Sequence, residues 1–466
     1  YIENLFLTAF ALFLAWVIIE ITYDIQIHIL EIKAIVSKHY NIWISILLLL
    51  FLPAITALHT FVRFSRKPVT SSLQNINRSK DKPEIKTIFL TLQYGITLSL
   101  IVCSLFFIKQ LNYMLDTNPG YRTKDIIKVW FQRPTSSMSY TVDEIRHQEK
   151  VNKYILETLQ SSPIFETFCF GISPYEFPLN PLNKKKVRIP GGEWKEVIHM
   201  TVSPDFLTLY DIPFLGKGFP VTPNEVLLNE TAKRLFSQNG KLPELLESDG
   251  NAKGTYLLVK GFTDDFQTVH LSQHNEPIIL SIHNESIFYQ KKLMAAISPG
   301  HRQEVILFLE KLHNKIGQGD FEYTFVSDEI KELYNKDKQV AIIYSVFALI
   351  AILISSLGLF GLSLFDVQQR YREIAIRKVN GATTSIIIQM LLRKYYKLLA
   401  ISFVVATPVT WLIIHKYLES FAHKTDISWW LFAIALLLTG AISLLTLIWQ
   451  IRKAARTNPA EVIKSE

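Results

Sequence analysis

The chain has 466 residues, of which 49% are hydrophobic, and it carries a formal net charge of +8. Its apolar residues are concentrated in long blocks, which excludes an ordinary soluble globular protein. Two cysteines are too few for a disulfide framework or a cysteine-based metal site. The basic residues lie beside the apolar blocks, so membrane topology explains the positive charge better than nucleic-acid binding does.

Six apolar blocks are long enough, or nearly so, to cross a bilayer. A helix needs about 20 apolar residues to span a hydrocarbon core of about 30 Å. No charged residue occurs in Ser345–Leu364 or in Trp429–Trp449. The predicted spans are Asn4–Ile21, Ile42–Phe61, Ile88–Ile108, Val340–Phe365, Leu398–Ile414 and Ile427–Gln450.

The basic residues also predict an orientation, because Lys and Arg in short loops mark the cytoplasmic side. They are abundant in residues 63–86, in residues 366–397 and in the C-terminal tail, and scarce in residues 23–41 and 417–426. Six spans then alternate consistently, with both ends of the chain inside. The long polar segment 109–338 is therefore expected outside, as a domain with its own core.

The patterns within this outer segment are typical of a mixed α and β fold. Two strand candidates show alternation, a third is rich in β-branched and aromatic residues, and apolar residues recur at helical spacing in two helix candidates, so two strand–helix–strand units are expected. The candidates are the strands Ile126–Phe131, Val197–Val202 and Thr255–Phe262 and the helices Val142–Leu159 and His301–Ile316. A continuous helix is predicted over Glu322–Phe347, because no Gly or Pro lies between Phe321 and Gly358.

Searches for catalytic and metal sites in the sequence find no convincing candidate. His270 and His274 would share a metal-binding face near Asp264 and Asp265 only in a helix, and the surrounding turn and strand residues argue against one. The Walker A pattern is absent from the sequence, so ATP hydrolysis is expected in a separate subunit. The spans between residues 340 and 450 have no ionisable residue at mid-depth, which argues against proton-coupled transport.

A short amphipathic helix is predicted between the fourth and fifth spans, at residues 368–380. Gly381 is suited to end it in a left-handed cap, and residues 383–385 offer an N-cap for the next helix. Basic and apolar faces allow this helix to lie on anionic lipid or to dock into a groove of an ATPase subunit. Composition by itself favours the lipid.

The segment Arg372–Ala382 reads Arg-Glu-Ile-Ala-Ile-Arg-Lys-Val-Asn-Gly-Ala and lies between two spans. It resembles the cytoplasmic segment of FtsX-like, MacB-type ABC transporter permeases. The resemblance implies that the helix contacts the nucleotide-binding subunit, which reverses the preference for lipid. Ala375 stands where the family usually has Gly, and Asn380 where it usually has an apolar residue, and both changes are compatible with a helix.

Three other segments carry the same resemblance. Val202–Phe219 and Val226–Ala232 resemble the MacB-type periplasmic core domain, and Arg456–Ile463 resembles the closing motif of the family. The implied fold class is an α-helical membrane protein with six transmembrane helices and one α+β periplasmic domain. The implied ATPase-coupling residues are Arg372, Glu373, Ile374, Ile376, Arg377, Lys378 and Gly381, and the cytoplasmic tail motif is Arg456, Asn458 and Pro459.

Residues 1–84 resemble the last two spans and the linker of a preceding permease half, as in the duplicated permeases of Bacteroidetes-type bacteria. A faint repeat between Asn41–Leu73 and Asp426–Ile463 agrees with this, and most of that N-terminal half is expected to be missing from the chain. The remaining expected domains are a stalk span at 85–108, the periplasmic domain at 109–338 and an FtsX-like permease domain at 339–466.

The resemblance implies a permease subunit in the bacterial inner membrane that couples ATP hydrolysis by a partner to movement of the periplasmic domain, for export or extraction of a substrate. ATP and Mg would bind the partner, and no cofactor is expected in this chain. Expected partners are an ABC ATPase subunit, membrane lipid, a second permease half and a periplasmic adaptor or peptide substrate, with no nucleic acid. Two alternatives remain open: a regulator of an envelope enzyme and a sensor without transport.

Overall fold

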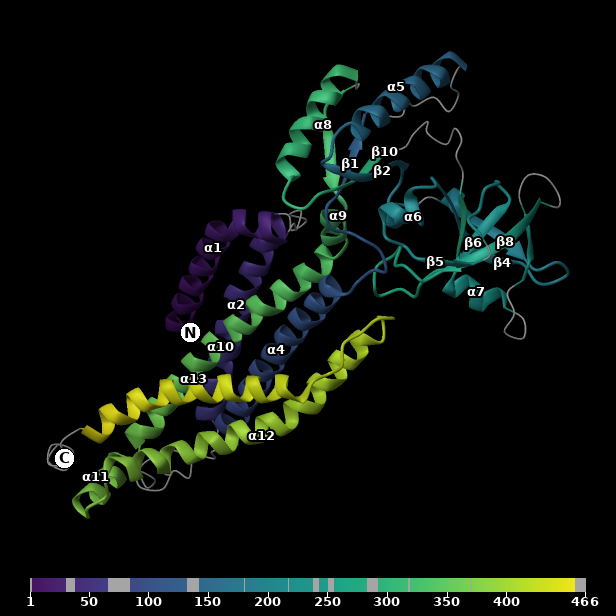
Figure 1. The fold of residues 1–466 in the computed structure, drawn as a ribbon. Helices are drawn as coiled ribbons and strands as arrows, with labels where there is room; N and C mark the ends of the chain where they lie inside the picture. The colour runs from purple at the N-terminus through teal and green to yellow at the C-terminus, as the bar shows by residue number, and fades with distance from the viewer. Residues whose placement is uncertain are drawn as a thin grey trace. The chain divides into compact units, whose positions relative to one another are not determined.

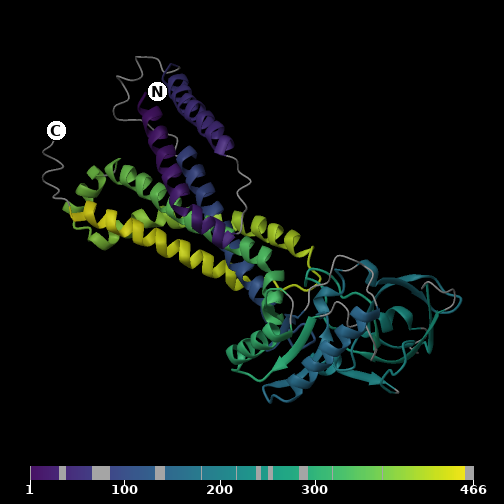
Figure 2. The ribbon, with the colours of Figure 1, turned by 90° about the horizontal axis from the view of Figure 1, so that it is seen from above.

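The computed structural model divides the chain into two compact units, which are described separately. Unit 1 contains residues 1–108, 337–414 and 427–466, and unit 2 contains residues 109–336 and 415–426. The structure describes residues 2–30, 38–65, 84–131, 142–179, 181–216, 218–237, 243–249, 255–282, 292–316, 319–369 and 371–456. Figures 1 and 2 show the course of the chain from two directions.

Unit 1 is built from helices, as the apolar blocks predict (Figure 1). In the part of the chain that is described, four helices are long and apolar enough to cross a membrane. These are α4 (Glu84–Asp116), α10 (Asn335–Gln369), α12 (Thr384–Leu418) and α13 (Trp429–Arg456), although the ends of α4, α10 and α12 extend into unit 2. They correspond to the last four of the six predicted spans.

The first two predicted spans form α1 (Ile2–Leu30) and α2 (Lys38–Ser65), which pack against each other. Their continuous apolar stretches within the described residues, Ile2–Val17 and Ile42–Ile55, are shorter than those of the other four helices. The count of six spans therefore remains a prediction, whereas a membrane protein with several spans agrees with the structure.

Unit 2 contains a four-stranded antiparallel sheet, here called sheet A, in the order β11-β1-β10-β2. Its units β1–α5–β2 and β10–α8–β11 confirm the two predicted strand–helix–strand units. Each pair of parallel strands has one strand of the other pair between them, which is the split βαβ arrangement. The elements are β1 (Ile126–Trp130), α5 (Val142–Gln160), β2 (Phe165–Gly171), β10 (Lys292–Ile297), α8 (Arg302–Ile316) and β11 (Glu322–Phe325).

The segment between β2 and β10 forms a second sheet, sheet B, in which the strand β8 closes a ring. Around this ring the order is β8-β6-β9-β4-β3-β7, and β7 pairs back with β8. The short strand β5 pairs with the last residues of β8, whereas β7 pairs with the first ones. Gly216 of β5 lies opposite Gly261 of β8. The strands are β3 (Lys184–Arg188), β4 (Lys195–Val202), β5 (Phe214–Gly216), β6 (Glu225–Asn229), β7 (Leu245–Ser248), β8 (Thr255–Thr263) and β9 (Ile278–Ile282).

The core of unit 2 lies in three layers because both sheets are apolar on both faces. One face of sheet A packs on α5 and α8 through residues such as Ile127, Ile155 and Leu309. Its other face packs on sheet B and on α6 (Phe206–Leu209). A third cluster lies between sheet B and α7 (Glu230–Phe236). The side chain of Asn229 caps α7 by accepting a hydrogen bond from the backbone N–H of Ala232.

The prediction of one continuous helix over Glu322–Phe347 is wrong. Residues 322–325 form β11, which pairs with β1, and two helices follow, α9 (Val326–Leu333) and α10. Tyr334 separates these helices, with φ −95° and ψ 10°. The alternating residues before Val326 gain more from joining an existing sheet than from extending a helix, because strand preference depends on tertiary neighbours.

Candidate functional site

The segment that resembles the permease coupling motif forms a short helix between two long ones. Helix α10 ends at Gln369, α11 covers Tyr371–Val379, and α12 begins at Thr384. The predicted helix at 368–380 is therefore shorter at both ends, since residues 368 and 369 continue α10. Gly381 has φ +88°, and the N–H of Ala382 donates to the carbonyl of Arg377 at 2.9 Å. These contacts confirm the predicted left-handed cap.

The side chains of α11 divide between burial and exposure. Ile374 is only 3% exposed, whereas Ile376 is 51% and Val379 is 68% exposed. On the exposed side, Glu373 and Arg377 form an ion pair of 2.9 Å one turn apart. The helix is thus held by Ile374 and presents apolar and charged groups together, which suits docking against a protein or a lipid surface.

The remaining predicted coupling and tail residues are placed less completely. Arg372 and Lys378 belong to α11, and Arg456 is the last residue of α13. Asn458 and Pro459 lie outside the described residues. The structure therefore places the backbone of the whole coupling motif but only the start of the tail motif.

Sequence reasoning missed a contact that closes the loop on either side of α11. Asp366, near the end of α10, accepts hydrogen bonds from Lys394 Nζ at 2.5 Å and from the Tyr395 hydroxyl at 3.1 Å, both on α12. The Asp366 side chain is 20% exposed. This contact joins α10 and α12 directly to each other on either side of α11. A single Asp among apolar residues at a span end is the signal that could have indicated this contact.

Polar side chains connect α4 to its neighbours along the spans. The Gln93 amide donates to the carbonyl of Ile354 on α10 at 2.8 Å, and Ser104 and Ser345 hydroxyls are 2.9 Å apart. On the α12 side, the hydroxyl of Ser402 donates to the carbonyl of Thr91. Interhelical hydrogen bonds of this kind stabilise membrane helices by about 1 kcal/mol each.

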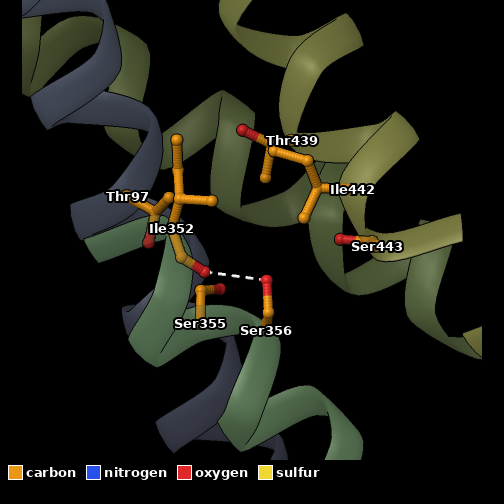
Figure 3. A pocket seen from close by; sticks show the side chains of 7 residues that line it. All are labelled: Thr97, Ile352, Ser355, Ser356, Thr439, Ile442 and Ser443. Carbon is orange, nitrogen blue, oxygen red and sulfur yellow. Dashed lines mark hydrogen bonds between the residues drawn. The ribbon is translucent and has the colours of Figure 1, made fainter. Parts of the chain in front are cut away.

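A small polar cavity lies between α4, α10 and α13 (Figure 3). Its volume is about 10 Å³, enough for about one water molecule. Hydroxyl groups dominate its lining, and the Ser356 hydroxyl donates to the carbonyl of Ile352 at 2.8 Å. The lining residues are Thr97, Ile352, Ser355, Ser356, Thr439, Ile442 and Ser443. Such a cavity serves helix packing and has no room for a transported substrate.

A charge cluster in unit 2 forms a second candidate feature, which sequence patterns did not reveal. Lys128, in the middle of β1, has a side chain only 4% exposed. Its ammonium group pairs with Glu176 at 2.9 Å and also with Glu329 on α9. Glu176 in turn pairs with Lys292 of β10 at 2.6 Å. The cluster therefore links sheet A to α9, the helix that precedes α10.

The pKa values within this cluster follow from burial and from the opposite charges. Burial lowers the pKa of Lys128 to about 8, although Glu176 acts in the opposite direction. Burial raises the pKa of Glu176, but Lys128 and Lys292 outweigh it, and the resulting pKa lies below the ordinary value of 4.5. Lys128, Lys292 and Glu329 line one wall of a pocket of about 400 Å³. The cluster combines two Lys and two Glu side chains, so its formal charges balance.

The residues considered for a metal site lie in a loop. His270 contacts the rings of Tyr334 and Phe421, with centroid distances of 4.8 and 6.1 Å, and its Nδ1 is 2.8 Å from the Ser272 hydroxyl. The residues between β8 and β9 form no helix. Within the described ranges, no group of three His, Cys, Asp or Glu side chains is arranged to hold a metal ion.

Comparisons with known proteins agree with the motif. Residues 345–459 match the family described as FtsX-like permease C-terminal. A segment of 162 residues is 29% identical to the macrolide export ATP-binding/permease protein MacB 2 of Aeromonas hydrophila. That match covers 34% of this chain and 25% of the relative, so the chain spans about a quarter of the length of the curated relative it matches.

Two solved structures are similar in part. One is a domain of a protein designated a permease from Porphyromonas gingivalis, with 14% identity over 44% of this chain and 90% of the other. The other is the extracellular domain of the noncanonic ABC-type transporter YknZ from Gram-positive bacteria, with 9% identity over 43% and 99%. The TM-score is 0.26 in both cases.

The matched region contains most of α10, all of α11 and α12, and α13, that is, the helices on both sides of the coupling segment. It includes every predicted coupling residue from Arg372 to Gly381. Residues 345–459 match the FtsX-like permease C-terminal family, and the predicted resemblance of the chain to FtsX-like, MacB-type permeases is confirmed.

Proposed function

We propose that the chain is the permease subunit of an ABC transporter in which a separate ATPase subunit drives movement of unit 2. The observation that carries the proposal is the FtsX-like match across α10, α11 and α12. The exposed Ile376 and Val379 beside the Glu373–Arg377 pair give α11 a surface for the ATPase. ATP and Mg would bind that partner.

The coupling step follows from the connections around α11. Docking of the ATPase would shift α11, and the Asp366–Lys394 contact would transmit this shift to α10 and α12 as one body. The spans would then transmit movement to unit 2 rather than form a channel. Substrate would be handled outside the membrane, for export or extraction.

The orientation that we propose has six spans and places residues 109–338 in the periplasm, with the chain in the bacterial inner membrane. The basic residues of 366–397 would lie on the cytoplasmic side, where the segment Arg372–Ala382 would contact the ATPase. A second permease half would complete the machine, and a periplasmic adaptor or a peptide or protein substrate would contact unit 2. Membrane lipid would surround the spans.

Co-purification tests the existence of the ATPase partner. Gently solubilised chain from its native host is expected to retain an ABC ATPase, whose hydrolysis rate the permease stimulates. If no ATPase is retained and none is encoded nearby, both the transporter and a regulator driven by ATP are ruled out. A membrane sensor would then be the remaining candidate.

The coupling role of α11 is tested by the double substitution Arg377→Glu with Lys378→Glu. Charge reversal at these two positions of α11 is expected to abolish ATPase stimulation while the protein still inserts into the membrane. The matched control is Arg393→Glu, an exposed basic residue on α12 outside the motif. Stimulation that stays unchanged in the double variant would refute the role assigned to α11.

Transport and regulation differ in what the stimulated complex does. A transporter would move or extract a substrate in reconstituted vesicles. A regulator would instead activate an envelope enzyme that binds unit 2, with no substrate moved.

A further inference from the structure

Unit 2 contains a small apolar cluster separate from the cores of its two sheets, here called the junction cluster. Its buried members are Met114, Leu271, Tyr334 and Phe421. Leu111, Ile330, Leu333 and Tyr417 pack around them. These residues come from the end of α4, the loop before β9, α9 and its boundary with α10, and the end of α12 with the segment that follows it.

The chain passes between the two units at four places, and each one lies close to this cluster in sequence. Unit 2 begins at Lys109, ends its long segment at Lys336, and includes the short segment from His415 to Asp426. Leu111, Tyr334 and Tyr417 each lie two residues from one of these boundaries, and Phe421 is in the middle of the short segment. Three of the four connections therefore have a residue of this cluster within two positions of the boundary.

The short segment 415–426 is fastened to unit 2 by hydrogen bonds as well. The backbone N–H groups of Ala422 and His423 donate to the carbonyls of Ser272 and Leu271, each at 3.1 Å. The side chain of Gln110 accepts from both the N–H and the hydroxyl of Thr425, at 3.1 and 2.9 Å. A loop that only connected two spans would not need these partners.

Lys109 adds a further bond, from its ammonium group to the carbonyl of Asp426 at 2.9 Å. Together with Gln110, it joins the end of α4 directly to the end of the segment 415–426. Movement of α12 or α13 would therefore reach unit 2 through this segment and through α4 at the same time.

Tyr334 is placed where a hinge would be expected. It is the one residue between α9 and α10 and has a backbone conformation outside the helical region. Its side chain is held in the cluster at 4% exposure, with its ring 4.8 Å from that of His270. On one side, α9 is fixed to sheet A by Val326 and by the Glu329–Lys128 pair. A change in the angle between α9 and α10 would therefore be accommodated by the backbone of Tyr334.

We propose that the junction cluster is the pivot through which movement of the spans reaches unit 2. The segment 415–426 is then a third mechanical connection beside α4 and α9–α10, and Tyr334 is the hinge. This inference rests on the proposed function. Packed clusters transmit movement well because they have few alternative arrangements and low compressibility. Phe421 is the buried residue of the third connection within the junction cluster.

The test uses the full chain with the ATPase that co-purifies with it. Phe421→Ala is expected to lower ATPase stimulation about tenfold, within the range that is typical of coupling between sites. The matched control is Trp429→Ala, which removes a larger aromatic ring that is 80% exposed at the start of α13. Hydrogen exchange at the backbone N–H groups of Ala422 and His423, measured in the same samples, shows whether the segment 415–426 has lost its hydrogen bonds to unit 2.

A disulfide between Ser272→Cys and Ala422→Cys, whose backbones are hydrogen-bonded, separates a mechanical role from loss of folding. The native Cys103 and Cys169 are buried, which limits side reactions. In the Phe421→Ala background, oxidation is expected to restore stimulation and reduction to remove it again. Equal stimulation by the Phe421→Ala and Trp429→Ala variants, or no rescue on oxidation, would overturn the inference. If the wild-type chain stimulates no ATPase, the proposed function itself fails.

Discussion

Lys128 shows how much a single residue in unit 2 depends on its partners. An ammonium group at 4% exposure is tolerated because Glu176 and Glu329 contact it. Removing one member of a buried ion pair typically costs about 3–5 kcal/mol, because the remaining charge has lost its partner. The cluster is thus a fixed link between sheet A and α9, not a set of surface charges.

Substituting Lys128→Met, which keeps the apolar stem, is expected to destabilise sheet A locally by about 3 kcal/mol. The readout is hydrogen exchange of β1 and β10, where protection should fall about a hundredfold. Lys153→Met is the control, since Lys153 is 78% exposed and lies 3.9 Å from Glu157. Exposed pairs contribute less than about 1 kcal/mol. Equal losses in the two variants would contradict the role of the cluster.

Glu176 makes this link sensitive to acid. Its pKa in the folded protein is below 4.5, so its pairing is fully effective above that pH and is lost as the pH falls through the folded-state value. Lys128, with a pKa of about 8, stays charged throughout this acid range. Protection of β1 and β10 against hydrogen exchange, corrected for the intrinsic pH dependence of exchange, should therefore decrease as the pH falls below 4.5, because Glu176 pairs with Lys128 and Lys292. The Glu176→Gln variant should have lower protection at neutral pH and a smaller decrease in acid.

At the scale of elements, the contact of α4 with α10 depends on a small residue. A Cβ added at Gly358 would lie 2.7 Å from Gln93 Oε1, and the same Gln93 amide donates to the carbonyl of Ile354. Gly361, one turn along the same helix, has no atom within 4 Å of such a Cβ. Small residues let membrane helices approach closely, so the two glycines have different roles.

Gly358→Ala is expected to displace the Gln93 side chain and to destabilise the helix packing by about 1–3 kcal/mol. Gly361→Ala should be neutral or stabilising by up to about 1 kcal/mol, because Ala is the better helix former. Thermal unfolding of the solubilised chain distinguishes the two variants. A lower midpoint temperature of unfolding for Gly361→Ala than for Gly358→Ala would show that the close approach of Gly358 to Gln93 does not determine the stability of the helix packing.

Element predictions from the sequence succeeded where the interactions are local. The helix α5, the helix α8 and the cap at Gly381 depend on residues a few positions apart, and each is present as expected. The continuous helix after Glu322 failed because β1, nearly 200 positions earlier, pairs with residues 322–325. No local pattern reveals a partner at that distance.

At the scale of the whole molecule, six spans predict opposite accessibility for unit 2 and for the coupling segment. A cysteine at Lys153, on the exposed face of α5, should react with an impermeant maleimide in intact spheroplasts. One at Ser385, at the start of α12, should react only after permeabilisation. The native cysteines are buried and should give little background. If the Ser385→Cys variant is labelled in intact spheroplasts, the predicted orientation is wrong.

The sequence by itself determined that the chain has long apolar helices, that basic residues flank them and that Arg372–Ala382 resembles the cytoplasmic segment of FtsX-like, MacB-type permeases. Each of these features depends on composition or on neighbours within a few turns. Only the tertiary structure decided that Asp366 meets Lys394, that Lys128 meets Glu329 and that Phe421 packs beside Tyr334. These contacts join residues from about 30 to 200 positions apart, and such pairs form only when folding brings separate elements together.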